Sequence, residues 1–159
     1  MSDYRLNTGD AAPDIDLPIW PEGSLALSEY RGHWVIVYFY PKDSTPGCTT
    51  ESCAFRDALP DFTAANAKII GVSRDSVKSH GRFTEKQSLN FPLIADTEEV
   101  LCKAFDVWRL KKNYGKEYMG IERSTFIINP EGKVVHAWRK VRVKDHVATV
   151  LETLQTLQA

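Results

Sequence analysis

The feature that most constrains the fold is an uninterrupted run of apolar and aromatic residues, WVIVYFY, from Trp34 to Tyr40. All of these residues are β-branched or aromatic, which favours a strand. Because the run does not alternate with polar residues, it is typical of a strand covered on both faces, as in the parallel part of a sheet. A second run, KIIGVS from Lys68 to Ser73, predicts another buried strand.

Helices are predicted between and after these strands. The first begins near Cys48, and we expect a kink or restart at Pro60 because proline lacks the N–H group that a helix interior requires. A second helix is predicted over residues 75–87. A third is expected after an N-terminal cap formed by Asp96 and Glu99.

Further strands and a last helix complete the pattern. A short strand is predicted over 91–94, and the segments 125–128 and 134–138 flank an Asn-Pro-Glu-Gly turn that is typical of a β-hairpin. The last helix has its apolar residues on one stripe, namely Val147, Val150, Leu151, Leu154 and Leu157. This order predicts a single α/β domain over residues 1–159, with a mixed central sheet flanked by helices in a thioredoxin-like arrangement.

Composition excludes several classes of function. A net charge of −1 gives no broad attraction to nucleic acid or to a membrane surface. No segment approaches the roughly 20 apolar residues of a membrane helix, and the N-terminus lacks the pattern of a signal peptide. We therefore expect a cytoplasmic protein. The local basic cluster is interpreted as solvated surface; it consists of Arg139, Lys140, Arg142 and Lys144.

The candidate chemistry lies at the first of three cysteines, Cys48, Cys53 and Cys102. Cys48 is predicted in the first turn of a helix, where unpaired N–H groups and the helix dipole stabilise the nucleophilic thiolate. Thr45 supplies a hydroxyl that can hydrogen-bond a thiolate or a peroxide oxygen, and Pro41 can shield the sulfur from water. The alternative is that Cys48 is a small buried hydrophobic residue.

Cys53 lies on the same predicted helix as Cys48. In an intact helix the two Cα atoms are about 8.5 Å apart, beyond the roughly 7 Å that a disulfide tolerates. A bond between them requires the first turns to unwind, and this layout suits a sulfenic acid with a resolving partner. The alternative is a Cys53 packed in the core without a redox role. For Cys102 we expect a packing role.

With these residues in place, the chain resembles the bacterioferritin-comigratory-protein (peroxiredoxin Q) branch of the peroxiredoxins, essentially from end to end. The matching segments are GDAAPD from Gly9, YPKD from Tyr40, TPGCT from Thr45, GVS from Gly71, DSVKSH from Asp75, FPL from Phe91 and RSTFII from Arg123. The resemblance implies that Cys48 is the peroxidatic cysteine, that Thr45 orients the peroxide and that Pro41 protects the intermediate. It also implies that Arg123 stabilises the thiolate and the charge that develops on oxygen.

Members of this family differ in the position of the resolving cysteine. The following helix has Thr84 here and no cysteine, so the resemblance leaves Cys53 as the candidate and implies a Cys48–Cys53 redox disulfide. It further implies hydrogen peroxide and organic hydroperoxides as substrates, no metal or organic cofactor, and a monomer. The expected reductant is thioredoxin, with glutaredoxin or glutathione as alternatives.

Three other interpretations remain open from the sequence. A thioredoxin-type disulfide reductase shares the expected fold but uses Cys-x-x-Cys, whereas this chain has four residues between the two cysteines. A zinc module would combine Cys48 and Cys53 with a histidine, at spacings that structural zinc sites rarely use. The histidines in question are His33, His80, His136 and His146. A redox sensor or holdase would form the disulfide without catalytic cycling.

Overall fold

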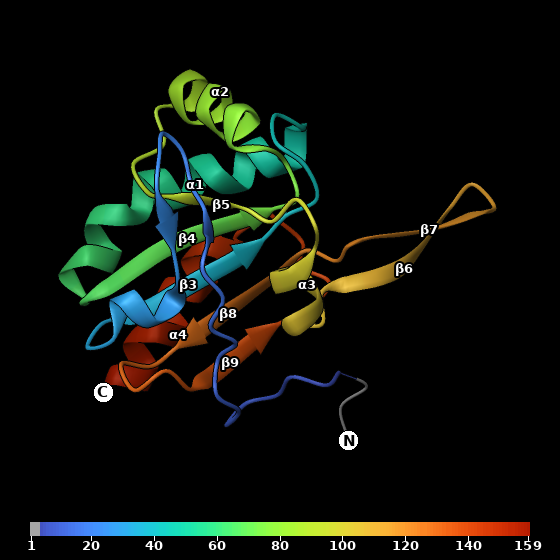
Figure 1. Ribbon diagram of the computed structural model, residues 1–159. Coiled ribbons are helices and arrows are strands. Elements are labelled where there is room, and N and C mark those ends of the chain that lie inside the picture. Colours follow the sequence, from blue (N-terminus) through green and yellow to red (C-terminus); the bar gives the residue numbers. More distant parts are fainter. Residues whose placement is uncertain (1–3) are drawn as a thin grey trace.

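The computed structural model describes residues 4–159. At its centre lies a five-stranded sheet with the strand order β5-β4-β3-β8-β9 (Figure 1). The strands are β3 (Trp34–Phe39), β4 (Ala67–Ser73), β5 (Leu93–Ala95), β8 (Ser124–Ile128) and β9 (Val134–Trp138). β3, β4 and β5 are parallel, whereas β8 and β9 are antiparallel to their neighbours. The mixed sheet of the predicted α/β fold is thereby confirmed.

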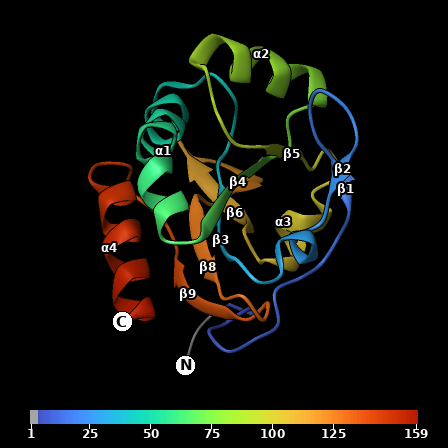
Figure 2. The same ribbon diagram turned by 90° about the vertical axis from the view of Figure 1, so that its left-hand side faces the viewer.

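Helices and short elements cover both faces of this sheet (Figure 2). On one side lie α1 (Pro46–Ala64), α2 (Val77–Gln87) and α4 (His146–Gln158). On the other side lie the short helix α3 (Val100–Ala104), the 3₁₀ helix η1 (Leu27–Tyr30) and the small hairpin of β1 (Leu17–Pro18) and β2 (Ser24–Leu25). No helix within residues 4–159 is long and apolar enough to cross a membrane.

The central strand β3 explains why its sequence contains no polar alternation. Val35, Val37 and Phe39 pack into one hydrophobic cluster. Ile36 and Tyr38, together with Tyr40 just after the strand, pack into the cluster on the opposite face. All six side chains are 2% exposed or less, because successive side chains of a strand point to opposite faces and both faces here are covered.

The structure contradicts the predicted interruption at Pro60, since α1 continues through it to Ala64. Pro60 cannot donate to the carbonyl of Arg56, four residues earlier. That carbonyl accepts a hydrogen bond from the Asn90 side chain instead, at 3.3 Å. A side chain from another segment therefore replaces the hydrogen bond that proline removes.

The starts of the helices lie close to the predicted positions. α1 begins at Pro46, so Cys48 lies in its first turn as predicted, and α2 begins at Val77 after an N-cap at Ser76, two residues later than predicted. The N-cap residue of α3 is Glu99 rather than Asp96. The Asp96 side chain still caps the first turn, because it accepts a hydrogen bond from the Cys102 backbone N–H at 2.7 Å.

A long hairpin that the sequence analysis missed projects from the body of the protein (Figure 1). It is formed by β6 (Trp108–Asn113) and β7 (Lys116–Ile121), joined by Tyr114 and Gly115 with φ values of 51° and 76°. Two consecutive positive φ values define a type I′ turn, which suits the twist of a two-residue hairpin. The Asn-Tyr-Gly sequence at this point was the available signal.

Gly71 provides a test of the packing between the parallel strands. A Cβ atom at this position would lie 2.6 Å from Leu93 Cδ2 and 2.9 Å from Tyr38 Cζ. We expect Gly71→Ala to lower the free energy of unfolding by about 1–3 kcal/mol through overpacking, measured by urea unfolding. The exposed Lys78→Ala is the control and should change it by less than about 0.5 kcal/mol. If Gly71→Ala left the free energy of unfolding unchanged, the side chains of Leu93 and Tyr38 would have to move aside without cost.

Candidate active site

Cys48 lies in the first turn of α1, at the end of the loop that follows β3. Thr45 is the N-cap residue with an extended backbone, and Pro46 occupies the first helical position, for which the fixed φ of proline is suited. The early N–H groups of a helix have no partner within it, so this end of α1 favours an anion. Cys48 is only 1% exposed, so its sulfur is largely screened from water.

Arg123 reaches this sulfur from the segment between β7 and β8. Its Nη2 atom is 3.3 Å from Cys48 Sγ, and its Nη1 atom is 2.6 Å from Glu51 Oε1. The planar guanidinium thus donates to a thiol and to a carboxylate at once. Gly47 leaves room for this arrangement, since a Cβ there would lie 3.3 Å from Nη2. The fold therefore brings together two predicted residues that are far apart in the sequence.

Glu51 is a member of this site that the sequence analysis did not identify. It is fully buried, one turn after Cys48 on α1, and among residues 4–159 its Oε2 atom has no hydrogen-bond partner. Burial raises its pKa to about 7, although the neighbouring Arg123 acts in the opposite direction. The spacing of three residues from Cys48 was the available signal, because it places both side chains on one helix face.

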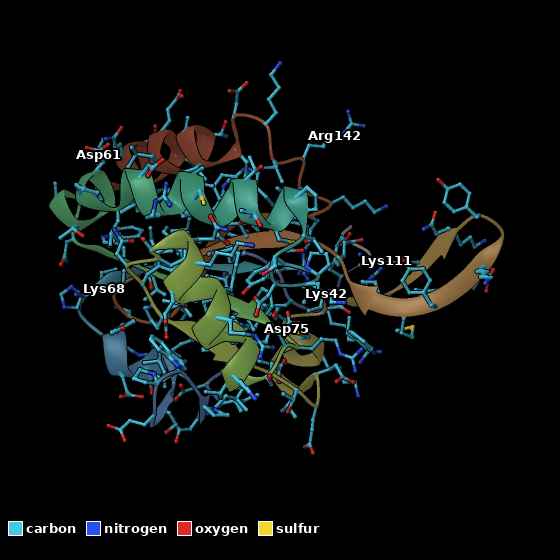
Figure 3. All side chains as sticks on the ribbon, turned by 90° about the horizontal axis from the view of Figure 1, so that it is seen from above. Lys42, Asp61, Lys68, Asp75, Lys111 and Arg142 are labelled. Atoms are coloured by element: carbon cyan, nitrogen blue, oxygen red, sulfur yellow. The ribbon has the colours of Figure 1, made fainter. Side chains whose placement is uncertain are left out.

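Thr45 and Pro41 lie in the loop that leads to Cys48. The Thr45 hydroxyl donates to the backbone carbonyl of Lys42 at 2.8 Å, which closes the loop into a turn and leaves the oxygen lone pairs able to accept. Pro41 is half-buried and lines a shallow depression together with Lys42, Arg74 and Asp75. Figure 3 shows Lys42, Asp75 and the hairpin residue Lys111 in the same region, near the start of α1.

Cys53 is half-buried on the same continuous helix as Cys48, and all three cysteines are free thiols. Its Sγ atom donates to the side chain of Gln87 at the end of α2, at 3.5 Å. Cys53 follows Cys48 by five positions, which places their Cα atoms about 8.5 Å apart in an intact α-helix. A bond between them therefore requires a change in the helix.

Cys102 lies on the other side of the sheet, in the hydrophobic cluster opposite to the one that contains Cys48. Its side chain is fully buried. Burial raises the pKa of its thiol far above the ordinary value, and the nearby Asp96 acts in the same direction. A buried protonated thiol is a poor nucleophile, so these surroundings agree with the predicted packing role.

The histidines are not gathered around the cysteines. Within residues 4–159, no group of three or more His, Cys, Asp or Glu side chains is placed to hold a metal ion. His80 is fully buried and contacts Asp43, and His146 contacts the Thr125 hydroxyl at 2.8 Å.

Comparison with known proteins agrees with this arrangement. The model of the AhpC/TSA family matches residues 8–137, and the chain belongs to this family. Peroxiredoxin Bcp of Bacillus subtilis is 55% identical over 152 residues, which are 96% of this chain and 97% of that protein. Peroxiredoxin Bcp of Xanthomonas campestris is 53% identical over 155 residues, which are 98% of this chain and 97% of that protein.

Solved structures give the same result. The X. campestris bacterioferritin comigratory protein, studied for its alkyl peroxide reduction activity, is 51% identical with a TM-score of 0.90, over 99% of this chain and 100% of that one. AhpC of Mycobacterium tuberculosis is 28% identical with a TM-score of 0.80, over 97% of this chain and 94% of that one. The chain is thus a thiol peroxidase of the peroxiredoxin class, as the sequence resemblance predicted.

The buried carboxyl group of Glu51 predicts a pH dependence of stability. Its pKa is about 7 in the folded protein and near 4.5 without burial, so between these values the folded state binds a proton that the unfolded chain has released. Rising pH in this window therefore lowers the free energy of unfolding, by at most about 3 kcal/mol. Glu51→Gln removes this decrease. Urea unfolding at about pH 5 and about pH 7.5 measures it. If the free energy of unfolding fell equally with pH in the wild type and in Glu51→Gln, the raised pKa of Glu51 would be contradicted.

Proposed function

We propose that Cys48 reduces hydroperoxides and that Cys53 resolves the product. The observation that carries this proposal is the position of Cys48 Sγ, at the N-terminal end of α1 and 3.3 Å from Arg123 Nη2. A helix N-terminus and a guanidinium both stabilise an anionic sulfur. The thiolate attacks the terminal oxygen of the peroxide and the O–O bond breaks. Cys48 becomes a sulfenic acid, and the leaving oxygen takes up a proton as water or an alcohol.

The neighbouring residues have distinct roles in this first step. Arg123 stabilises both the thiolate and the negative charge that develops on the leaving oxygen, the type of stabilisation that fixed donors provide without a metal. Thr45, whose hydroxyl proton is directed to Lys42, uses its free lone pairs to accept a hydrogen bond from the peroxide. Pro41 shields the sulfenic acid from bulk water.

The second step forms the disulfide and regenerates the enzyme. Cys53 attacks the sulfenic sulfur of Cys48, an S–S bond forms and water leaves. The first turns of α1 unwind for this step, because the helical spacing of about 8.5 Å exceeds the reach of a disulfide. Thioredoxin then reduces the disulfide, with glutaredoxin or glutathione as alternative reductants. The enzyme works as a monomer in the cytoplasm.

The substrates are hydrogen peroxide and organic hydroperoxides. The alkyl peroxide reduction activity of the X. campestris protein, whose fold is very similar, supports the organic class. The depression beside Pro41 and Lys42 supports an approach from this side, because it opens next to the loop that carries Thr45.

Cys48→Ser should abolish peroxide consumption, since a serine hydroxyl is not ionised near neutral pH and cannot replace the thiolate. Consumption of hydrogen peroxide with a thioredoxin system measures this. Cys102→Ser is the matched control and should retain nearly full activity, because Cys102 lies on the opposite side of the sheet. Substantial activity of Cys48→Ser would remove this residue from the mechanism.

Cys53→Ser should allow a single oxidation of Cys48 but no turnover with thioredoxin, because the sulfenic acid has no partner. It should also make Cys48 prone to further oxidation to the sulfinic acid. Single-turnover peroxide consumption and mass spectrometry measure both effects. Full thioredoxin-dependent turnover would exclude Cys53 as the resolving residue.

Mapping of disulfides after one equivalent of peroxide tests the pairing directly. A Cys48–Cys53 bridge within one chain is the expected product. A Cys48–Cys102 bridge or a disulfide-linked dimer would contradict the proposed cycle.

A further inference from the structure

The loop before Cys48 contains a buried carboxylate, Asp43, that the proposed cycle does not use. Three side chains form hydrogen bonds with it: the Tyr40 hydroxyl donates at 2.6 Å, the Ser79 hydroxyl donates at 2.8 Å, and His80 Nδ1 lies at 2.8 Å. In addition, the backbone N–H of Asp43 donates to Asp75 Oδ2 at 2.9 Å. These hydrogen bonds use both oxygen atoms of the carboxyl group, so its position is fixed by three side chains.

His80 connects this cluster to the central sheet. It is fully buried, and its second ring nitrogen, Nε2, lies 2.9 Å from the carbonyl oxygen of Ile94. Both ring nitrogens of His80 therefore have a hydrogen-bond partner, one in the loop and one in β5. The contact between Asp43 and His80 is therefore a buried hydrogen bond that joins the loop to the first turn of α2. Removing one partner of such a buried hydrogen bond leaves the other partner unsatisfied.

Directly after Asp43 the chain is fixed much less firmly. Ser44 has a left-handed backbone with φ of 63°. Within the described residues, the hydrogen bonds of segment 44–50 are local to the loop and the helix, apart from the contact of Cys48 with Arg123. Asp43 is thus the last point at which the loop is fixed to α2 before the turns that must unwind.

The opposite end of the same segment also contacts α2. Cys53 donates to the Gln87 side chain, and Arg56 Nη1 donates to the Gln87 carbonyl at 2.6 Å. One helix, α2, therefore contacts the chain on both sides of the unwinding turns, through His80 at its start and Gln87 at its end. Figure 3 shows α2 running obliquely to α1, with one end near α1 and the other towards Asp75.

We propose that His80 is a positioning residue for peroxide reduction, which acts through Asp43 to hold the turn from Thr45 to Cys48 in its reactive geometry. This inference rests on the proposed function of Cys48 and Cys53. The hydrogen bond between Asp43 and His80 favours the peroxide-reducing form of the loop and is not needed for the bond with Cys53. Its loss therefore slows the reaction with peroxide, whereas disulfide formation stays as fast or becomes faster.

The test separates the two chemical steps in His80→Gln and in the milder Ser79→Ala, which removes one donor to Asp43. Rapid quenching with a thiol-alkylating reagent, followed by mass spectrometry, measures free thiol, sulfenic acid and disulfide after one addition of hydrogen peroxide. We expect His80→Gln to slow the first step about 10- to 100-fold, because small displacements of reacting atoms have effects of this size. Ser79→Ala should change it in the same direction by a few-fold.

Ser76→Ala is the matched control. It removes the N-cap of α2, whose hydroxyl accepts from the Ser79 N–H at 3.1 Å, and it does not contact Asp43. It should weaken α2 without changing either rate. Equal slowing of both steps in Ser79→Ala, no slowing of the first step, or a selective effect of Ser76→Ala would each overturn the proposal. Wild-type protein that fails to react with peroxide would overturn the proposed function, and this inference with it.

Discussion

The chemistry of this protein depends on one cation placed in a nearly dry site, the guanidinium of Arg123. It contacts Cys48 and Glu51 on the same face of α1. Both side chains are buried, and the positive charge of the guanidinium favours their anionic forms, which burial alone disfavours. The protonation of Glu51 near neutral pH is part of this balance, because a neutral Glu51 leaves more of the cation to the sulfur. The sheet brings the two parts of the site together. β3 leads into the loop before Cys48, and its neighbour β8 directly follows the segment that carries Arg123.

The layered fold could be predicted from the sequence because its central strands are continuous apolar runs. Trp34 to Tyr40 can lie only where both faces are covered, and the order of the elements then gives the α/β class. The projecting hairpin was missed because Leu110, Tyr118 and Met119 are exposed, so its apolar residues do not mark a buried face. The break at Pro60 was wrongly predicted because its compensation by Asn90 comes from a distant segment.

The candidate site shows the same division. Cys48, Thr45 and Pro41 share one loop, so local sequence rules place them together. The place of Arg123 came only from family resemblance, because no local rule joins residues that the fold brings together from different elements. Glu51, Asp43 and His80 were not assigned, since their roles arise from burial and from contacts between α1, the loop and α2. The burial of polar side chains by distant segments is the property that is hardest to predict from a single sequence.

The hydrogen bond from the Asn90 side chain, which replaces the one that Pro60 cannot make, limits how far α1 can unwind. The Asn90 amide binds the Arg56 carbonyl, and the Arg56 guanidinium binds the end of α2. Together they clamp the middle of α1 to a neighbouring segment, immediately past Cys53. Unwinding that starts at Pro46 therefore reaches these contacts after about three turns, and the distal half of α1 remains packed against β4 and α4. The mobile part of the helix is thus bounded by its contacts rather than by its own sequence.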